Sequence, residues 1–252
     1  MNSIILCEGP DDLWFISYYL HKRDGWDIDK NTKRLWRQYK IVPLNDHQDV
    51  KYLKKDNNGV AVWYVGGKDC FENPIKTAIK RYVSEIPSEA VGSIVIVRDR
   101  DIDEENVILR KIEKWLPGIA HLENRKTTEY RIDCENGETA YTRITPIIIP
   151  FDGDGAIETL LLNSISESSQ TGRIIVDAAK NYVNSVKNND EVCRLYLVHQ
   201  RFILKAQYSA TIAVTNPDHS TGQFQDMVMN CPWENSPYVR SHFEIILRAI
   251  AN

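Results

Sequence analysis

Short apolar runs alternate along the first half of the chain with segments in which apolar residues recur at helical spacing. The runs are rich in β-branched residues, which is typical of buried strands. They stand at 4–7, 59–65 and 93–97, and the amphipathic segments follow at 13–20, 70–86 and 104–116. This order predicts an α/β fold, with a parallel sheet flanked by helices on both faces. We expect the strands that end at Cys7, Val65 and Val97 to place their carboxyl ends at one edge.

The second half of the chain predicts a hairpin followed by helices. Residues 127–151 alternate apolar and polar positions on both sides of Asn136-Gly137, the pattern of a β-hairpin. The stretch 217–238 is punctuated by Pro, Gly and Asn, so it predicts a loop, from which Trp233 packs on the core. Helical periodicity is found before and after this loop, at 156–165, 201–213 and 239–250.

The segment between the first two buried strands is polar and does not show the pattern of a buried strand. Residues 31–40 and 51–55 are basic with interleaved aromatic residues, as a nucleic-acid-contacting surface can be, although a solvated charged face is the commoner explanation. Residues 39–44 predict an extended segment. This region is therefore expected to be an excursion from the sheet.

The composition is ordinary for a folded globular protein. The 252 residues are 42% hydrophobic and 26% charged, enough for one large core. We expect a core at residues 1–115 and a continuation at 116–252, which completes the sheet and forms one compact unit with it. The net charge of −4 neither indicates nor excludes nucleic-acid binding, because a local basic face or a metal can offset phosphate charges.

The cysteines and the hydropathy pattern indicate in which cellular compartment the protein is found. The five cysteines are scattered and form no CxxC pair, which argues against a disulfide framework or a zinc site and favours a reducing environment. The N-terminus does not resemble a signal peptide, and no apolar run is long enough to span a bilayer. We expect a cytoplasmic protein that does not associate with membranes.

Acidic residues gather where the predicted strands end. Glu8 follows the first strand, and Asp99 and Asp101 end the third, so their side chains are expected at one edge of the sheet. Carboxylates so placed repel one another, and a hard divalent cation relieves this repulsion. The alternative is a solvated acidic strand end paired with Arg98 and Arg100.

Asp11 and Asp12 are explained differently from Glu8. They fall in the first turn of the helix that begins after Gly9, where acidic residues cap the helix and complement its dipole. Helix capping leaves Glu8 unexplained, and its partners are therefore sought at the other strand ends.

Two motifs resemble those of a known family. "CEGPDD" at residues 7–12 and "VRDRDID" at 97–103 resemble the signature motifs of the Toprim domain, in the expected order on the expected strands. Topoisomerases, primases, OLD-type nucleases and recombination proteins share that domain. The chain lacks a topoisomerase tyrosine domain and a primase zinc ribbon. It is most similar to small stand-alone bacterial Toprim proteins and to the Toprim half of OLD-type nucleases.

The resemblance implies Mg²⁺-dependent (or Mn²⁺-dependent) hydrolysis of phosphodiester bonds in DNA or RNA. OLD-type nucleases carry a further acidic residue and a lysine after the second motif, and Glu158 and Lys205 are the candidates here. Glu8 and Lys205 would then be catalytic, and Lys68, Arg98 and Arg100 would bind substrate. The implied metal ligands are Glu8, Asp12, Asp99, Asp101 and Glu158. A partner ATPase or a second copy of the chain is also implied.

Other interpretations remain open for these residues and for the whole chain. Glu158 can be an ordinary glutamate of a helix N-terminus, and Lys205 can extend to solvent from an apolar stretch. The chain can also be a non-catalytic Toprim-like module that binds nucleic acid or protein, in a defence or mobile-element system. A phosphatase of the haloacid dehalogenase kind is disfavoured, because its nucleophilic aspartate lies where this chain has Glu8.

Overall fold

The chain forms two compact units. The computed structural model describes residues 2–29, 41–219, 224–229 and 231–251. The sheet unit comprises Met1–Asp99, Asp103–Ile148 and Phe243–Asn252, and the helical unit comprises Arg100–Ile102 and Ile149–His242. The boundary expected at residue 115 falls inside the sheet unit, because the hairpin that follows belongs to the same sheet.

The described part of the sheet unit is built on a seven-stranded sheet with the order β2-β3-β4-β1-β5-β7-β6. The central strands are those that the sequence predicts as buried. Every residue of β1 from Ser3 to Cys7 is buried, and so is β5 from Ser93 to Arg98. The bounds are β1 (Asn2–Cys7), β2 (Asp27–Ile28), β3 (Asp49–Lys55), β4 (Asn58–Tyr64), β5 (Ser93–Asp99), β6 (Thr128–Asp133) and β7 (Thr139–Ile149).

The central strands run parallel, as expected. β1 pairs in parallel with β4 on one side, where Cys7 lies opposite Tyr64, and with β5 on the other, where Leu6 lies opposite Ile96. The carboxyl ends of these three strands therefore meet at one edge of the sheet. β6 and β7 form the predicted antiparallel hairpin, from Thr128 opposite Ile144 to Asp133 opposite Thr139.

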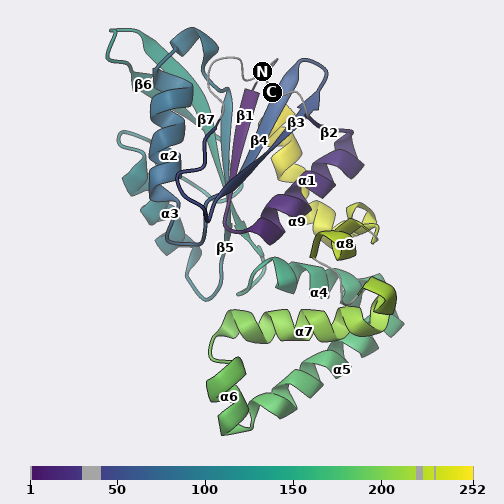
Figure 1. Ribbon diagram of the computed structural model, residues 1–252. Coiled ribbons are helices and arrows are strands. Elements are labelled where there is room, and N and C mark those ends of the chain that lie inside the picture. The colour runs from purple at the N-terminus through teal and green to yellow at the C-terminus, as the bar shows by residue number, and fades with distance from the viewer. Residues whose placement is uncertain (1, 30–40, 220–223, 230, 252) are drawn as a thin grey trace. The chain divides into compact units, whose positions relative to one another are not determined.

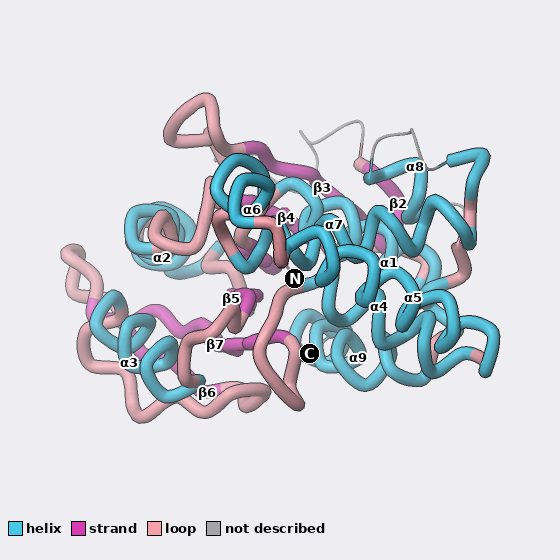
Figure 2. The backbone as a smooth tube through the Cα atoms, turned by 90° about the horizontal axis from the view of Figure 1, so that it is seen from below, coloured by secondary structure: helices cyan, strands magenta, loops and turns pink. Residues whose placement is uncertain are grey.

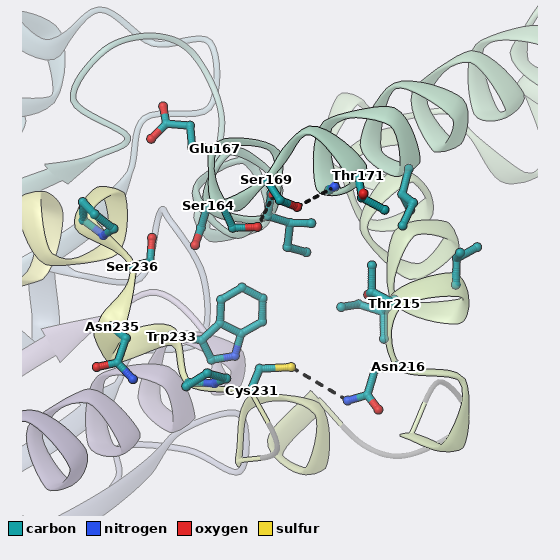
Figure 3. A pocket seen from close by; sticks show the side chains of 18 residues that line it. Ser164, Glu167, Ser169, Thr171, Thr215, Asn216, Cys231, Trp233, Asn235 and Ser236 are labelled. Atoms are coloured by element: carbon teal, nitrogen blue, oxygen red, sulfur yellow. Dashed lines mark hydrogen bonds between the residues drawn. The ribbon is translucent and has the colours of Figure 1, made fainter.

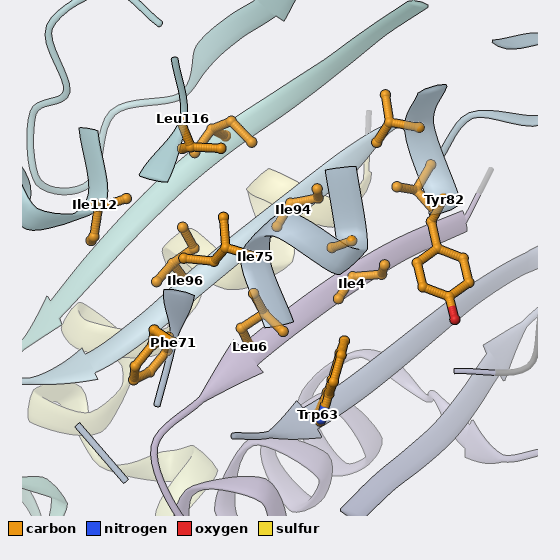
Figure 4. Packing of buried hydrophobic residues seen from close by; sticks show 14 of the residues in the cluster. Ile4, Leu6, Trp63, Phe71, Ile75, Tyr82, Ile94, Ile96, Ile112 and Leu116 are labelled. Carbon is orange, nitrogen blue, oxygen red and sulfur yellow. The ribbon is translucent and has the colours of Figure 1, made fainter. Parts of the chain in front are cut away.

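Helices cover both faces of the sheet (Figure 1). These helices are α1 (Pro10–Asp24), α2 (Glu72–Ile79), α3 (Glu105–Trp115) and α9 (Pro237–Ala251), of which α9 enters the sheet unit at Phe243. On one face Phe71, Ile75 and Ile112 pack with Ile4 and Ile96 (Figure 4). On the other face, the rings of Phe15 of α1 and Phe243 of α9 have centroids 5.0 Å apart. Helices therefore shield both faces of the sheet from water, as strands with apolar residues on both faces require.

Parts of the described excursion between the first two buried strands, Asp27–Ile28 (β2) and Asp49–Lys55 (β3), belong to the sheet, which corrects the sequence prediction. Residues 51–55 lie in β3, an antiparallel neighbour of β4, where Tyr52 is buried and donates a hydrogen bond to the Ile41 carbonyl (3.1 Å). Tyr52 is therefore a core residue and not a surface on which bases stack. Residues 41–44 form no strand, and 31–40, the other basic aromatic stretch, lie outside the described residues.

The stretch 217–238 is also more ordered than predicted. It contains the helix α8 (Phe224–Met229) and two short 3-10 turns, at Pro217–His219 and Trp233–Asn235. Trp233 is buried as expected, and it packs within the helical unit.

The helical unit is formed around three helices that lie side by side, α4 (Ile157–Ser168), α5 (Gln170–Lys187) and α7 (Gln200–Thr215) (Figure 2). The short helix α6 (Asp190–Tyr196) connects α5 with α7. The sharp turn between α4 and α5 is held by Ser169, whose hydroxyl accepts a hydrogen bond from the Gly172 N–H (2.9 Å). Among the described residues, none of the helices is both long enough and apolar enough to cross a membrane.

Gly172 makes this turn possible, and we expect Gly172→Ala to lower the free energy of unfolding by up to about 2 kcal/mol. A Cβ at this position would clash with the backbone oxygen of Ile165. Overpacking of this kind costs about 1–3 kcal/mol, of which the better helix propensity of Ala recovers only about 1 kcal/mol. Urea unfolding measures the loss. The control is Gly153→Ala, where a Cβ would meet no atom within 4 Å, and an equal effect in both variants would contradict the explanation.

Candidate functional site

Glu8 lies at the carboxyl edge of the sheet beside a glycine turn. It follows β1 directly, and its backbone oxygen accepts a hydrogen bond from the Gly67 N–H (2.9 Å) in the loop after β4. Gly66 has φ +93°, and a Cβ there would lie 3.0 Å from the His47 oxygen, so this turn requires glycine. The turn is followed by Lys68, which is half-buried. The structure thus brings the Lys68 segment to the strand end that carries Glu8.

Glu8 and Asp99 end adjacent parallel strands, and each has one buried carboxylate oxygen, Oε2 in Glu8 and Oδ1 in Asp99. Both carboxylates act on the buried thiol of Cys7. Burial raises the pKa of Cys7 well above its usual value, and the charges of Asp12, Asp99 and Glu8 raise it further. Glu8 and Asp99, two of the five predicted metal ligands, therefore stand at the same edge of the sheet unit.

Asp12 also has a structural role. Its Oδ2 accepts a hydrogen bond from the Gly9 N–H (2.8 Å) at the beginning of α1, and the residue is 6% exposed. This is the reciprocal contact of a helix cap, in which a side chain of the first turn binds the backbone N–H that precedes the helix. The capping interpretation of Asp12 therefore holds.

The donor chemistry of this edge fits Mg²⁺ with few protein ligands. Among the described residues, no group of three or more His, Cys, Asp or Glu side chains is arranged to hold a metal ion. Mg²⁺ commonly binds to one or two carboxylates and completes its octahedral shell with water and substrate phosphate oxygens. Glu8 and Asp99 supply hard oxygen donors of this kind. The edge thus fits an ion that is bound together with a phosphate better than one enclosed by protein ligands alone.

Glu158 and Lys205 form a close ion pair in the helical unit. Glu158 lies in the first turn of α4, and its side chain is 7% exposed. The Nζ of Lys205, on α7, is 2.6 Å from its Oε1. The side chain of Lys205 is 46% exposed, so its ammonium reaches solvent as well as the Glu158 carboxylate. The Glu158 carboxylate gains most from the pair, because an unpaired buried charge is costly.

Asp101 is held near the beginning of the same helix. It forms an isolated antiparallel bridge with Gly155, with N–H to oxygen distances of 2.7 Å in both directions. The neighbouring Arg100 donates from Nη1 to the Gly153 oxygen (3.4 Å). Asp101, Glu158 and Lys205 thus all belong to the helical unit. The predicted centre of five carboxylates includes residues of both units, and it stays a prediction.

The comparisons with known proteins identify a family. The family model described as "Protein of unknown function (DUF3226)" matches residues 2–249. The chain belongs to this DUF3226 family. A crystal structure of a hypothetical protein from Pyrococcus horikoshii OT3 is similar to the DUF3226 chain at 15% identity and a TM-score of 0.40, over 92% of this chain and 97% of that one. A comparison with curated proteins finds no match.

Arg98 of the DUF3226 chain is buried, which the sequence did not indicate. Alternation along β5 places it on the face of Ile94 and Ile96, opposite Asp99, and its side chain is 1% exposed. Its Nη2 lies 3.8 Å from Oδ2 of Asp103, a residue that the sequence analysis did not single out. Arg98 therefore pairs with a carboxylate outside the predicted set of metal ligands. Because its side chain is buried, Arg98 cannot reach substrate in this arrangement, although it was predicted to bind it.

The burial of Arg98 has a testable consequence for stability. Its Nε and Nη1 are buried and make no hydrogen bond to the described residues. Because removing a guanidinium from water is costly, Arg98→Met is expected to leave the free energy of unfolding unchanged or to raise it by about 1 kcal/mol. Urea unfolding measures the change, with the exposed Arg131→Met as the matched control. A loss of more than about 2 kcal/mol would show that the buried guanidinium is stabilising.

Proposed function

We propose that the protein hydrolyses phosphodiester bonds in nucleic acid with the help of Mg²⁺ or Mn²⁺. The observation that supports this most strongly is the position of Glu8 and Asp99, at the ends of two adjacent parallel strands. Each carboxylate has a buried oxygen, and both act on the same thiol, that of Cys7. Negative charges gathered in this way repel one another, and a hard divalent cation favours their ionised forms.

The proposed roles follow from the chemistry of the side chains. A bound divalent ion lowers the pKa of its water and polarises a phosphoryl oxygen. Glu8 accepts the proton of the attacking water, which requires a hydrogen bond to that water. Lys68, in the segment after the glycine turn, and Arg100 provide positive charge for substrate phosphates. Asp99 would hold the ion, and Lys205 would offset negative charge that develops on the phosphate.

A second function, binding of nucleic acid without cleavage, is favoured by one observation. Among the described residues, no three side chains of metal-binding type are arranged to hold an ion. A module that recognises nucleic acid needs no such arrangement. In that case the acidic edge would be a solvated strand end, and a divalent ion would not change the affinity for nucleic acid.

Incubation of the purified full-length protein with nucleic acid distinguishes these functions. Single- and double-stranded DNA and RNA are offered with Mg²⁺, with Mn²⁺ and with EDTA. Cleavage that requires a divalent ion supports the nuclease. Tight binding without cleavage under every condition supports the binding module, and the absence of both overturns both proposals.

A further inference from the structure

An exposed aromatic and apolar surface lies where α6 leads into α7 (Figure 1). Tyr196, the last residue of α6, is 70% exposed, and Phe202, in the first turn of α7, is 36% exposed. Leu195 and Val198 in the same stretch are 54% and 58% exposed. Single exposed apolar side chains are common on any protein, whereas several in one short segment are typical of a binding surface. We call residues 194–202 the α6–α7 corner.

The charges around this corner are positive. Residues 192–217 include Arg194, Arg201 and Lys205 but no Asp or Glu. Arg194 and Arg201 are exposed, and neither forms an ion pair with any of the described residues. Arg201 lies over the Phe202 ring, with its Cζ 5.5 Å from the ring centroid. Two guanidinium groups beside exposed rings are therefore available to the phosphate groups of a ligand.

The large cavity of the helical unit lacks both of these features (Figure 3). It has a volume of about 920 Å³ and lies between the turn that joins α4 to α5, the end of α7, and residues 231–237. Its described lining contains no Lys or Arg, and its aromatic residue, Trp233, is only 5% exposed. A ligand that carries both aromatic rings and negative charges is therefore matched by the α6–α7 corner and not by this cavity.

We propose that the α6–α7 corner binds single-stranded nucleic acid, with unpaired bases stacked on Tyr196 and Phe202 and phosphates bound by Arg194 and Arg201. Single strands are commonly bound by this combination of exposed aromatic side chains and basic groups that contact the backbone. A duplex binds less tightly to such a surface, because its bases stack on one another and their faces are not accessible.

The proposal rests on the proposed function in one respect, since it makes a single strand the preferred substrate. Phe202 and Lys205 stand three residues apart on α7, so they are neighbours on one face of the helix. A strand that stacks on Phe202 therefore passes beside Lys205, the residue proposed to offset charge on the phosphate.

Binding measured in EDTA tests the corner independently of the acidic edge. A labelled DNA strand of mixed sequence and the matching duplex are titrated with the purified protein, and fluorescence anisotropy gives the two affinities. Both nucleic acids are longer than the site size of about 4–16 nucleotides that is common for single-strand-binding domains. The single strand is expected to bind about tenfold more tightly than the duplex.

Variants of Tyr196 test the stacking contact. Tyr196→Ala is expected to weaken binding of the single strand by a factor of about 5–150, the loss of one stacked base. Tyr196→Phe keeps the ring and should bind as the parent protein does. The matched control is Tyr141→Ala on β7, where the tyrosine is 53% exposed, and it should leave the affinity unchanged.

A variant of Arg201 tests the phosphate contact. Arg201→Gln is expected to weaken binding of the single strand and to reduce the slope of log affinity against log salt concentration by about 0.7, the loss of one phosphate contact. Arg173→Gln, exposed near the beginning of α5, is the matched control and should leave the slope unchanged.

The outcomes separate this inference from the proposed function. Equal affinity for single strand and duplex, or unchanged affinity in Tyr196→Ala, overturns the inference. Binding to vesicles of phosphatidylcholine and phosphatidylserine that Tyr196→Ala loses, while it still binds the single strand, also overturns it. Single-strand binding that Tyr196→Ala loses, without cleavage in Mg²⁺, supports the inference and contradicts the nuclease. Cleavage in Mg²⁺ with unchanged binding in Tyr196→Ala does the reverse.

Discussion

Asp99→Asn is expected to weaken Mn²⁺ binding about a hundredfold and to lower metal-dependent cleavage by a factor of about 1,000. Asp99 ends β5 with one buried carboxylate oxygen, and with Glu8 and Asp12 it raises the pKa of Cys7. An amide at this position keeps the size of the side chain but removes its charge. Calorimetric titration with Mn²⁺ measures the affinity, and a nucleic-acid cleavage assay measures the rate.

Whereas the affinity for Mn²⁺ should fall in this variant, the stability of the metal-free protein should not. Removing one of several gathered negative charges relieves repulsion, so Asp99→Asn is expected to leave the free energy of unfolding unchanged or to raise it slightly without metal. Glu8→Gln should lower the cleavage rate to a similar degree, because it removes the group that accepts the proton. Glu129→Gln, on the exposed side of β6, is the control. If Asp99→Asn binds Mn²⁺ as tightly as the parent protein, the acidic edge is only a solvated strand end.

The central strands could be predicted because their sequence permits little else. β1 and β5 are unbroken runs of buried, mostly apolar residues, and such runs are stable only in a sheet covered on both faces. The positions of Glu8 and Asp99 follow from the same rule, since the carboxyl ends of parallel strands lie at one edge. No knowledge of distant contacts is needed for this part of the fold.

β3 was missed because it lacks the alternation by which strands are recognised. Its two buried residues, Tyr52 and Leu53, are adjacent, and lysines stand on both sides of them. The strand is held in place by its ladder with β4 and by Lys51, whose ammonium lies over the Trp14 ring. These are long-range contacts, which a local hydrophobic pattern does not contain.

The partners of the charged residues in the candidate site could not be predicted from the sequence. For Lys205 the sequence left two interpretations open, solvent exposure and a role in the site, and its partner Glu158 lies on another helix. An arginine at a strand end is normally solvated, and the burial of Arg98 beside Asp103 depends on how β5 and the segment before α3 pack. Both contacts come from tertiary packing, which a local hydrophobic pattern does not contain.

Lys205→Met is expected to preserve Mn²⁺ binding while it lowers the rate of phosphodiester cleavage by about two to three orders of magnitude. The physical reason is that the ammonium offsets charge that develops on the phosphate only as the bond is cleaved. The side chain of Lys205 is 46% exposed although its Nζ is 2.6 Å from Glu158, so the ammonium remains accessible to a substrate. Lys187→Met, on the exposed end of α5, is the matched control.

The ion pair also predicts a structural effect, which a double variant separates from catalysis. Lys205→Met leaves the buried Glu158 carboxylate without its cation, so the free energy of unfolding should fall by about 1–3 kcal/mol. Adding Glu158→Gln removes the unpaired charge and should restore most of that stability. If Lys205 acts on the phosphate, cleavage remains slow in the stable double variant but not in Glu158→Gln alone, because only the double variant lacks the ammonium. Recovery of the cleavage rate together with stability would mean that Lys205 only supports the fold.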